Sequence, residues 1–248
     1  MRHRAILVSL LANVMLVGMA QAQSWEAVSL PESSSSAAGL RWETGAAAVA
    51  RCEAGAFSLM FIAVHESEPT QSHFRLNGGD WERVHWAAAE RPQLFFSRTA
   101  ARMARKFLGG GDLELRFTSD DQPPVLYQLD LPSDATALTG VMDGCGIPLS
   151  DVRDDIQIAD DLRWIARPSG NDLARHYPDR GRQGDGSILC VISRDGSLTD
   201  CEVTYDTPPG AGFGDATRAL APRFRLHRDQ AAEFEGWLVS IPVSWRLG

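Results

Sequence analysis

The sequence has little lysine, an excess of acidic residues and only one long apolar stretch. Of its 24 basic residues only Lys106 is a lysine, and we read this arginine bias as the mark of a GC-rich bacterial genome. No segment after residue 22 is long and apolar enough to cross a bilayer, which takes about 20 such residues. The 32 acidic residues give a formal charge of −8. This charge argues against sequence-independent nucleic-acid binding, because that needs clustered positive charge.

Motifs that mark enzymes and metal sites are missing as well. The sequence contains no Gly-x-Ser-x-Gly, His-Glu-x-x-His, Ser-x-x-Lys or Cys-x-x-Cys. We therefore predict no catalytic residue, no metal site and no cofactor, and we expect a binding protein rather than an enzyme. Two alternatives stay open within residues 46–147. His65, His73 and His85 could converge on a metal. An enzyme would need a concave pocket with converging histidine and carboxylate groups, and a filled core would argue against it.

Residues 1–22 have the three parts of a secretory signal. Met1–Arg4 is basic, Ala5–Ala20 is uncharged and mostly apolar, and Ala20–Ala22 is a small-x-small cleavage site. Cleavage would leave about 225 residues beginning at Gln23 and would lower the formal charge from −8 to −10. The pattern predicts an exported, soluble periplasmic protein without a stable membrane anchor. An uncleaved anchor is the alternative.

The rest of the chain predicts an α+β protein of two small domains. Residues 23–45 are a polar, flexible lead-in without a packing pattern. Residues 46–147 alternate strand segments with two helices and form a first domain of unassigned family. An acidic linker over residues 148–172 leads to a second domain at residues 173–248. We expect strands at residues 49–52, 57–64, 73–76, 81–86, 94–96, 113–117 and 125–131, and helices at residues 97–108 and about 133–145.

The helix expected at residues 97–108 and the linker carry opposite charges. Ser97 is the expected N-cap of the helix. Around its apolar face lie Arg98, Arg102, Arg105 and Lys106. A basic face could meet an acidic partner, although a solvated face is the commoner arrangement. The spacing of acidic residues in the linker does not match an EF-hand calcium loop, so we expect a solvated connector. These residues are Asp151, Asp154, Asp155, Asp160 and Asp161.

The four cysteines predict two disulfides, because an even number in an exported chain is typical of a disulfide framework. Residues 184–205 have the pattern of a hairpin with Asp195-Gly196 at its turn. Pairing that is symmetric about this turn places Cys190 directly opposite Cys201. Opposed residues have Cα atoms about 4.5–5.5 Å apart, within disulfide reach. Cys52 and Cys145 then form the second pair, between the first strand and the last helix of the first domain.

Several features follow one another in a definite order after residue 173. Tyr177-Pro178 comes first, and Gly184 then opens a strand of alternating apolar residues. Asp195-Gly196 follows, then a short return strand, a helix ending near an aromatic residue, and a final strand. The matching apolar residues are Ile188, Cys190, Ile192, Val203, Phe213, Ala216, Ala219 and Phe224, and the final strand runs from Leu238 to Trp245.

This order resembles the TonB C-terminal domain family. The resemblance implies a small sheet of two hairpin strands, a helix and a third strand. In energy-transducing members of the family, the last strand accepts an extended peptide from an outer-membrane receptor by β-augmentation. Pro242 cannot donate to a ladder, as expected on an edge strand. The resemblance therefore implies a partner-binding edge for an envelope protein or peptide at Leu238, Ser240, Pro242 and Ser244. Ser240→Pro would then weaken binding, provided that Ser240 points outward.

Two features of the family's energy transducers are missing. The chain has Ala174-Arg175 where the family usually carries Gln-Pro, and it has no long proline-rich spacer. We therefore expect a periplasmic binding or adaptor protein that acts in the envelope, for example in transport. A divergent energy transducer with an uncleaved anchor is the alternative. Pro242 could also serve only as a guard against strand addition.

Overall fold

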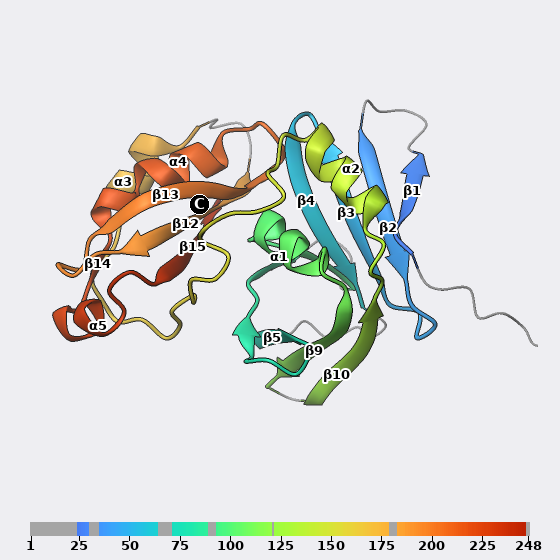
Figure 1. The fold of residues 1–248 in the computed structure, drawn as a ribbon. Coiled ribbons are helices and arrows are strands. Elements are labelled where there is room, and N and C mark those ends of the chain that lie inside the picture. The colour runs from blue at the N-terminus through green and yellow to red at the C-terminus, as the bar shows by residue number, and fades with distance from the viewer. Residues whose placement is uncertain are drawn as a thin grey trace, which may run out of the picture.

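The computed structural model describes residues 24–29, 35–63, 71–88, 93–120, 122–178 and 183–246. These residues form a mixed α+β structure, which confirms the predicted class. Their buried apolar side chains gather in two clusters, one from Trp25 to Met142 and one from Ala159 to Trp245. We refer to residues 24–147 as the N-terminal unit and to residues 159–246 as the C-terminal unit. Figure 1 shows the two units side by side.

Some expectations fall outside this part of the chain. The expected signal at residues 1–22 and the side chain of His65 are not among the described residues. Within the described part, no helix has the length and apolar character needed to cross a bilayer.

The expectation of a flexible lead-in at residues 23–45 is wrong where the structure describes this segment. Two strands form there, and the second pairs along its whole length with the strand that follows. Trp25, Leu40 and Trp42 are buried in the core. These apolar residues are scattered around a polar stretch of sequence, so they form no periodic pattern that would predict strands. The sheet has the order β1 (Glu26–Ser29), β2 (Ser36–Arg41), β3 (Ala47–Glu53), β4 (Ala56–Ile62), β8 (Leu94–Ser97) and β7 (Trp86–Ala88).

A second sheet faces the first across an aromatic core. Its order is β10 (Gln122–Leu131), β9 (Gly111–Ser119), β5 (Gln71–Leu76) and β6 (Glu82–Arg83). The ring of Phe61 on β4 lies 5.8 Å from that of Phe117 on β9 and 5.4 Å from that of Tyr127 on β10. Two helices complete the unit, α1 (Ala100–Phe107) and α2 (Thr136–Gly144).

Most expected elements of the N-terminal unit form, with two local differences. The strand expected at residues 81–86 divides into β6 and β7, which belong to different sheets. Ser97 does not cap α1, because it lies buried at the end of β8, and its Oγ instead accepts a hydrogen bond from the N–H of Thr99. Both differences come from tertiary pairing, which local patterns do not encode.

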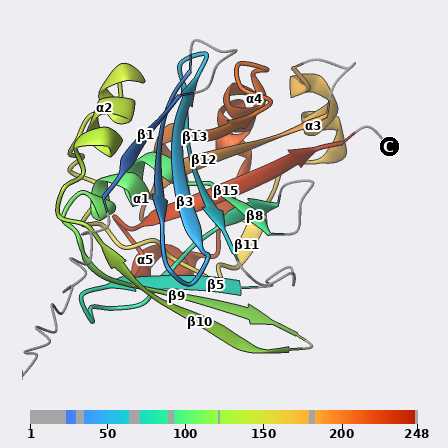
Figure 2. The same cartoon turned by 90° about the vertical axis from the view of Figure 1, so that its right-hand side faces the viewer.

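The C-terminal unit is built on an antiparallel sheet of order β13-β12-β15, so β15 is an edge strand as predicted. Helix α4 lies over one face of this sheet (Figures 1 and 2). The remaining elements surround this pair of layers. The bounds are β11 (Trp164–Ala166), α3 (Gly170–His176), β12 (Gly184–Ile192), β13 (Leu198–Thr207), α4 (Phe213–Ala219), a 3-10 turn (Ala221–Arg223), β14 (Arg225–Leu226), α5 (Arg228–Glu233) and β15 (Leu238–Trp245).

Glycines at the start of β12 allow α4 to approach the sheet closely. A Cβ atom on Gly186 would lie 2.3 Å from the main-chain oxygen of Phe213, and one on Gly184 would lie 2.2 Å from the Phe213 ring. Real Cβ contacts are never so short. The aromatic ring at the start of α4 is therefore seated directly on the backbone of β12, where it is fully buried.

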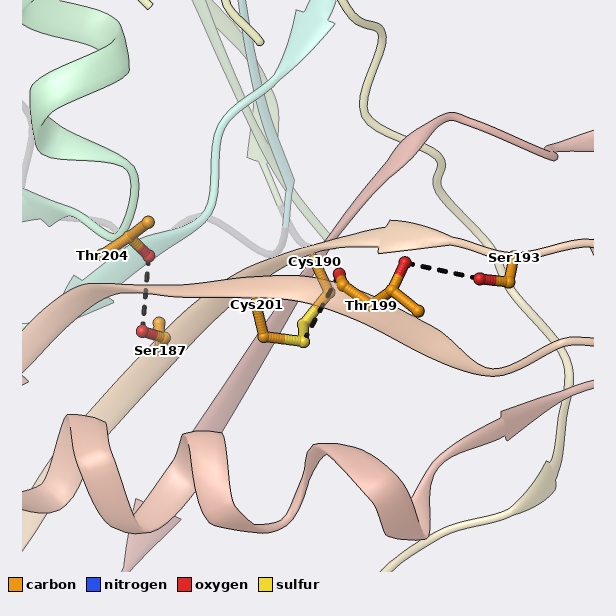
Figure 3. Close-up of a disulfide and its surroundings, with 6 residues drawn as sticks. All are labelled: Ser187, Cys190, Ser193, Thr199, Cys201 and Thr204. Carbon is orange, nitrogen blue, oxygen red and sulfur yellow. Dashed lines mark hydrogen bonds between the residues drawn. A yellow bond between two sulfur atoms is a disulfide. The ribbon is translucent and has the colours of Figure 1, made fainter.

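Both predicted disulfides are present, Cys52–Cys145 and Cys190–Cys201. The first joins β3 to the residue that ends α2. The second lies within the hairpin, with the two Cα atoms 4.1 Å apart (Figure 3). The pairing is not quite symmetric about the turn, because a bulge separates the pair Leu189–Glu202 from the pair Val191–Thr199. The extra residue in β13 is accommodated beside Cys201, where Asp200 has a φ of 44°.

The acidic linker is not a solvated connector, because α1 binds it. Arg105 donates two hydrogen bonds to the carboxylate of Asp154, at 2.6 and 2.8 Å. Arg102 donates to the main-chain oxygens of Arg153 and Ile156. The expectation of a solvated helix face is therefore wrong as well, since much of the basic face of α1 is covered by the chain's own linker.

Candidate functional site

Alternate residues of β15 turn their main-chain groups to the free side of the strand. In an antiparallel pair, a hydrogen-bonded residue directs both its N–H and its C=O toward its partner. The C=O of Trp237 accepts from the N–H of Ile192 at 2.9 Å, so odd-numbered residues face β12. The even-numbered residues face away, and we refer to their main-chain groups as the free edge. They are Leu238, Ser240, Pro242 and Ser244, the four predicted edge residues.

Pro242 sits where a proline costs the sheet nothing. Its missing N–H would point to the free edge and not to β12, so the ladder between β12 and β15 continues past it through Ile241 and Val243. The proline also removes one donor from the free edge. Pro242 therefore affects the hydrogen bonding of a strand that would pair with the free edge, and it does not affect the sheet itself.

The beginning of the free edge is already occupied. The N–H of Leu238 donates to the C=O of Gln157 at 2.9 Å, and the C=O of Leu238 accepts from the N–H of Ala159 at 2.8 Å. Between them, Ile158 forms a parallel bridge with Leu238. The linker thus pairs with the first residue of β15, which excludes Leu238 from an open binding edge.

Ser240 does not meet the condition of pointing outward, on which the Ser240→Pro test depends. It is only 8% exposed, and its Oγ has no hydrogen-bond partner among the described residues. Its side chain lies on the sheet face opposite α4, beside Leu189 of β12, which is also buried. The sequence did not predict that this face contacts the N-terminal unit. Because Ser240 is buried there, Ser240→Pro is not a clean test of strand addition.

The end of the free edge is open. Pro242 and Ser244 are exposed, and no main-chain partner of either on the free edge occurs among the described residues. The Oγ of Ser244 donates to the carboxylate of Asp185 at 2.5 Å. Asp185 also accepts from Arg246 at 3.1 Å and lies 3.8 Å from Arg98. The open end of the edge is therefore bordered by one carboxylate between two guanidinium groups.

Arg98 links this border to the N-terminal unit. Its Nη1 donates to the Oγ of Ser187 at 3.0 Å, and its guanidinium lies 5.5 Å from the centre of the Tyr205 ring. Burial lowers the pKa of Arg98, and the nearby carboxylate of Asp185 opposes this effect. Burial likewise raises the pKa of Tyr205. Both shifts follow from the closure of this sheet face by the N-terminal unit.

The residues of the Tyr-Pro motif support the other face of β15. The hydroxyl of Tyr177 donates to the main-chain oxygen of Trp245 at 3.2 Å, and the two rings meet edge to face at 5.6 Å. The indole of Trp245 donates to Thr217 of α4 at 3.1 Å. Pro178 follows at the surface. Tyr177 therefore fixes the end of the edge strand and is not part of the free edge.

The Asp-Gly motif shapes the hairpin turn. Asp195 accepts a hydrogen bond from the N–H of Ser197 at 2.9 Å and one from Arg225 at 3.0 Å. The hydrogen bonds from Ser197 are the main cause of the lowered pKa of Asp195. Gly196 has a φ of 83°, and its C=O accepts from the N–H of Leu226 at 2.9 Å. Both residues have structural contacts that lie away from the free edge.

His73 and His85 both lie near the carboxylate of Asp160, but the described residues do not complete a metal site there. His73 of β5 lies opposite Arg83, and His85 lies 3.7 Å from Asp160. No group of three side chains suited to a metal occurs in the part of the chain that the structure describes. The space between the sheets is filled by aromatic rings, among them Phe61 and Phe117.

A cleft of about 460 Å³ lies at the junction of the two units. The β5–β6 hairpin, α1, the linker and Trp237 form its walls. Its charged side chains are mostly paired, as in the contacts of Lys106 with Glu82 and of Arg83 with Asp160. The cleft therefore presents few free functional groups.

Two parts of this site were not predicted from the sequence. The first is the linker segment Gln157–Ala159 on the edge, and the second is the border formed by Arg98, Asp185 and Arg246. Charge complementarity between α1 and the linker was visible, but the sequence alone could not place the two in contact.

Comparison with family models, with curated proteins and with solved structures finds no match for this chain.

Proposed function

We propose that this chain is an exported binding protein of the TonB C-terminal domain family that recognises an extended peptide or protein segment by strand addition. The order of a hairpin, a helix over one face and a third strand at the edge supports this proposal, because the resemblance implies that arrangement. The contacts of Tyr177 with Trp245 give the Tyr-Pro motif a role in holding the last strand.

The observation that carries the proposal is the direction of the main chain at Ser244. Its N–H and C=O face the free edge, and the residue is exposed. Exposed, unpaired strand edges attract further strands, and peptide recognition uses this mode. Pro242 adds one more acceptor. The open part is short, so we expect weak binding, with each main-chain hydrogen bond contributing about 0.5–1.5 kcal/mol.

Ser244→Pro tests the proposal, because it removes the N–H on the free edge and no bond to β12. The probe is a blocked five-residue peptide of alternating valine and threonine, titrated into isotope-labelled protein and followed by NMR. We expect binding about five- to tenfold weaker than in the native chain. Ser244→Ala is the matched control, since it loses the same hydroxyl contact with Asp185 but keeps the N–H. Equal affinities for the two folded variants would contradict strand addition at this edge.

Export is the second part of the proposal. The two disulfides support an oxidising compartment, where such bonds form and persist. Fractionation of the native host cells, followed by N-terminal sequencing, tests it. We expect a soluble periplasmic protein that begins at Gln23. A full-length protein in the membrane fraction would favour the anchored energy transducer instead.

A further inference from the structure

The linker segment Gln157–Ala159 uses the same groups of β15 that an added strand would use. It accepts from the N–H of Leu238 and donates to its C=O, in parallel orientation, as an incoming strand would. The contact stops after one bridge, and the segment has left the edge before Ser240. It therefore covers only the beginning of the edge.

The N-terminal unit holds this segment in place through the residues that precede Gln157. Arg102 is only 6% exposed and donates to the main-chain oxygen of Ile156 at 2.8 Å, one residue before Gln157. One turn further along α1, Arg105 donates two hydrogen bonds to the carboxylate of Asp154, at 2.6 and 2.8 Å. Arg102, which is buried, and Arg105, which is half-buried, thus fix the backbone that leads into the cover.

The far side of the segment is held as well. Arg83 of β6 lies 3.7 Å from the carboxylate of Asp160 and 3.5 Å from that of Asp161, directly after Ala159. The N-terminal unit therefore contacts the linker on both sides of the three residues that pair with β15. Ala159 itself is buried in the core of the C-terminal unit.

We propose that Gln157–Ala159 is an autoinhibitory cover, held on Leu238 by Arg102 and Arg105, that limits strand addition to the open end of β15. The proposal rests on the proposed function, since it concerns which part of the same edge a partner can use. It assigns the N-terminal unit a role in the specificity of that edge. Release of the cover lengthens the edge by the two main-chain groups of Leu238.

Amide hydrogen exchange and peptide length test the cover in the full mature chain. The variants are Arg102→Met and Arg105→Gln, and Lys106→Met is the matched control, because its ion pair with Glu82 stays within the N-terminal unit. The probes are blocked peptides of alternating valine and threonine, five and eight residues long. The longer peptide can reach Leu238 and the shorter one can pair with residues 240–244 alone.

In the native chain and in Lys106→Met, we expect a slowly exchanging Leu238 amide and affinities for the two peptides within about twofold of each other. In Arg102→Met and Arg105→Gln, the Leu238 amide should exchange faster while those of Val239 and Ile241 stay slow. The eight-residue peptide should then bind about fivefold more tightly or better than the five-residue one, since two more main-chain hydrogen bonds form.

The outcomes separate this inference from the proposed function. A Leu238 amide that stays slow in both arginine variants overturns the cover, and so does a faster amide without any gain for the longer peptide. If neither peptide binds the native chain or the variants, strand addition itself fails. Because Val239 and Ile241 report on the β12–β15 ladder, their loss of protection would identify an unfolded variant, and Arg105→Gln, the milder change, then decides.

Discussion

Arg98 and Ser187 are 89 positions apart and are joined by a hydrogen bond of 3.0 Å from Nη1 to Oγ. The pair lies where the turn between β8 and α1 meets the sheet face opposite α4. Ser187 is fully buried, and the Arg98 side chain is 11% exposed. This contact joins the N-terminal unit to the sheet face that also carries Leu189 and Ser240, beside the edge strand.

Arg98→Met should weaken the coupling between the two units. The variant keeps the aliphatic part of the side chain but leaves Ser187 without its donor and removes one of the two guanidinium groups beside Asp185. We expect the free energy of unfolding to fall by about 1.5–3 kcal/mol, the range for hydrogen bonds to charged groups. Chemical denaturation measures it. Arg194→Met is the control, because this side chain is 80% exposed and its ion pair is stretched to 4.0 Å, so a similar loss there would refute the assignment.

Asp151 should make stability depend on acid. Arg153 donates to its carboxylate from both side chain and main chain, which lowers its pKa from 3.8 to about 2. Because the folded state holds the charged form more strongly, the stabilisation is present above pH 3.8 and is lost as the pH falls through about 2. Asp151→Asn should therefore cost about 1–2 kcal/mol near pH 5, allowing for partial screening, and almost nothing near pH 2. Urea denaturation across this range measures the difference, and a gap that does not narrow in acid would contradict it.

The parts of the fold that follow from local sequence could be predicted. The hairpin around Asp195-Gly196 and the Cys190–Cys201 pair depend on turn chemistry, alternation and short-range register. Cys52–Cys145 followed as the remaining pair, and Pro242 indicated the edge position of β15. Even there, the bulge beside Asp200 could not be predicted, because no particular residue type marks an extra residue in a strand. The strands at residues 26–29 and 36–41 were missed because tertiary pairing makes them a sheet: the first pairs with the second, and the second pairs with β3.

The candidate site could be predicted only in part. The sequence of each unit alone does not show which residues become buried between the two units. The four edge residues were predicted from the resemblance of the last strand and from Pro242, which cannot donate to a ladder. Whether Leu238 and Ser240 are free depends on the linker and on α1, which are more than fifty residues away in sequence. Opposite charges on α1 and the linker were the available signal for this contact.

The two disulfides should contribute unequally to stability. Cys52–Cys145 closes a loop of 93 residues and Cys190–Cys201 one of 11. In the loop-entropy model this corresponds to about 4–5 and about 3 kcal/mol. Replacing each pair with alanines and comparing guanidinium midpoints measures the difference. We expect the Cys52 and Cys145 double variant to be the less stable one, and the reverse order would show that packing of the buried Cys190 outweighs loop entropy.

Ser240 and Ser187 are both buried on the same sheet face but should respond in opposite ways to loss of their hydroxyl groups. The Oγ of Ser187 accepts from Arg98, whereas the Oγ of Ser240 has no partner in the part of the chain that the structure describes. Ser187→Ala leaves a buried guanidinium with one acceptor fewer and should cost about 1–3 kcal/mol. Ser240→Ala removes an unsatisfied hydroxyl and should be neutral or stabilising by up to about 1 kcal/mol. Thermal and urea unfolding of the two variants, which differ from the native chain by the same single oxygen atom, make the comparison direct. A loss of stability in Ser240→Ala equal to that in Ser187→Ala would mean that Ser240 does have a partner, and the beginning of the edge would then be more firmly closed than the contacts of Leu238 indicate.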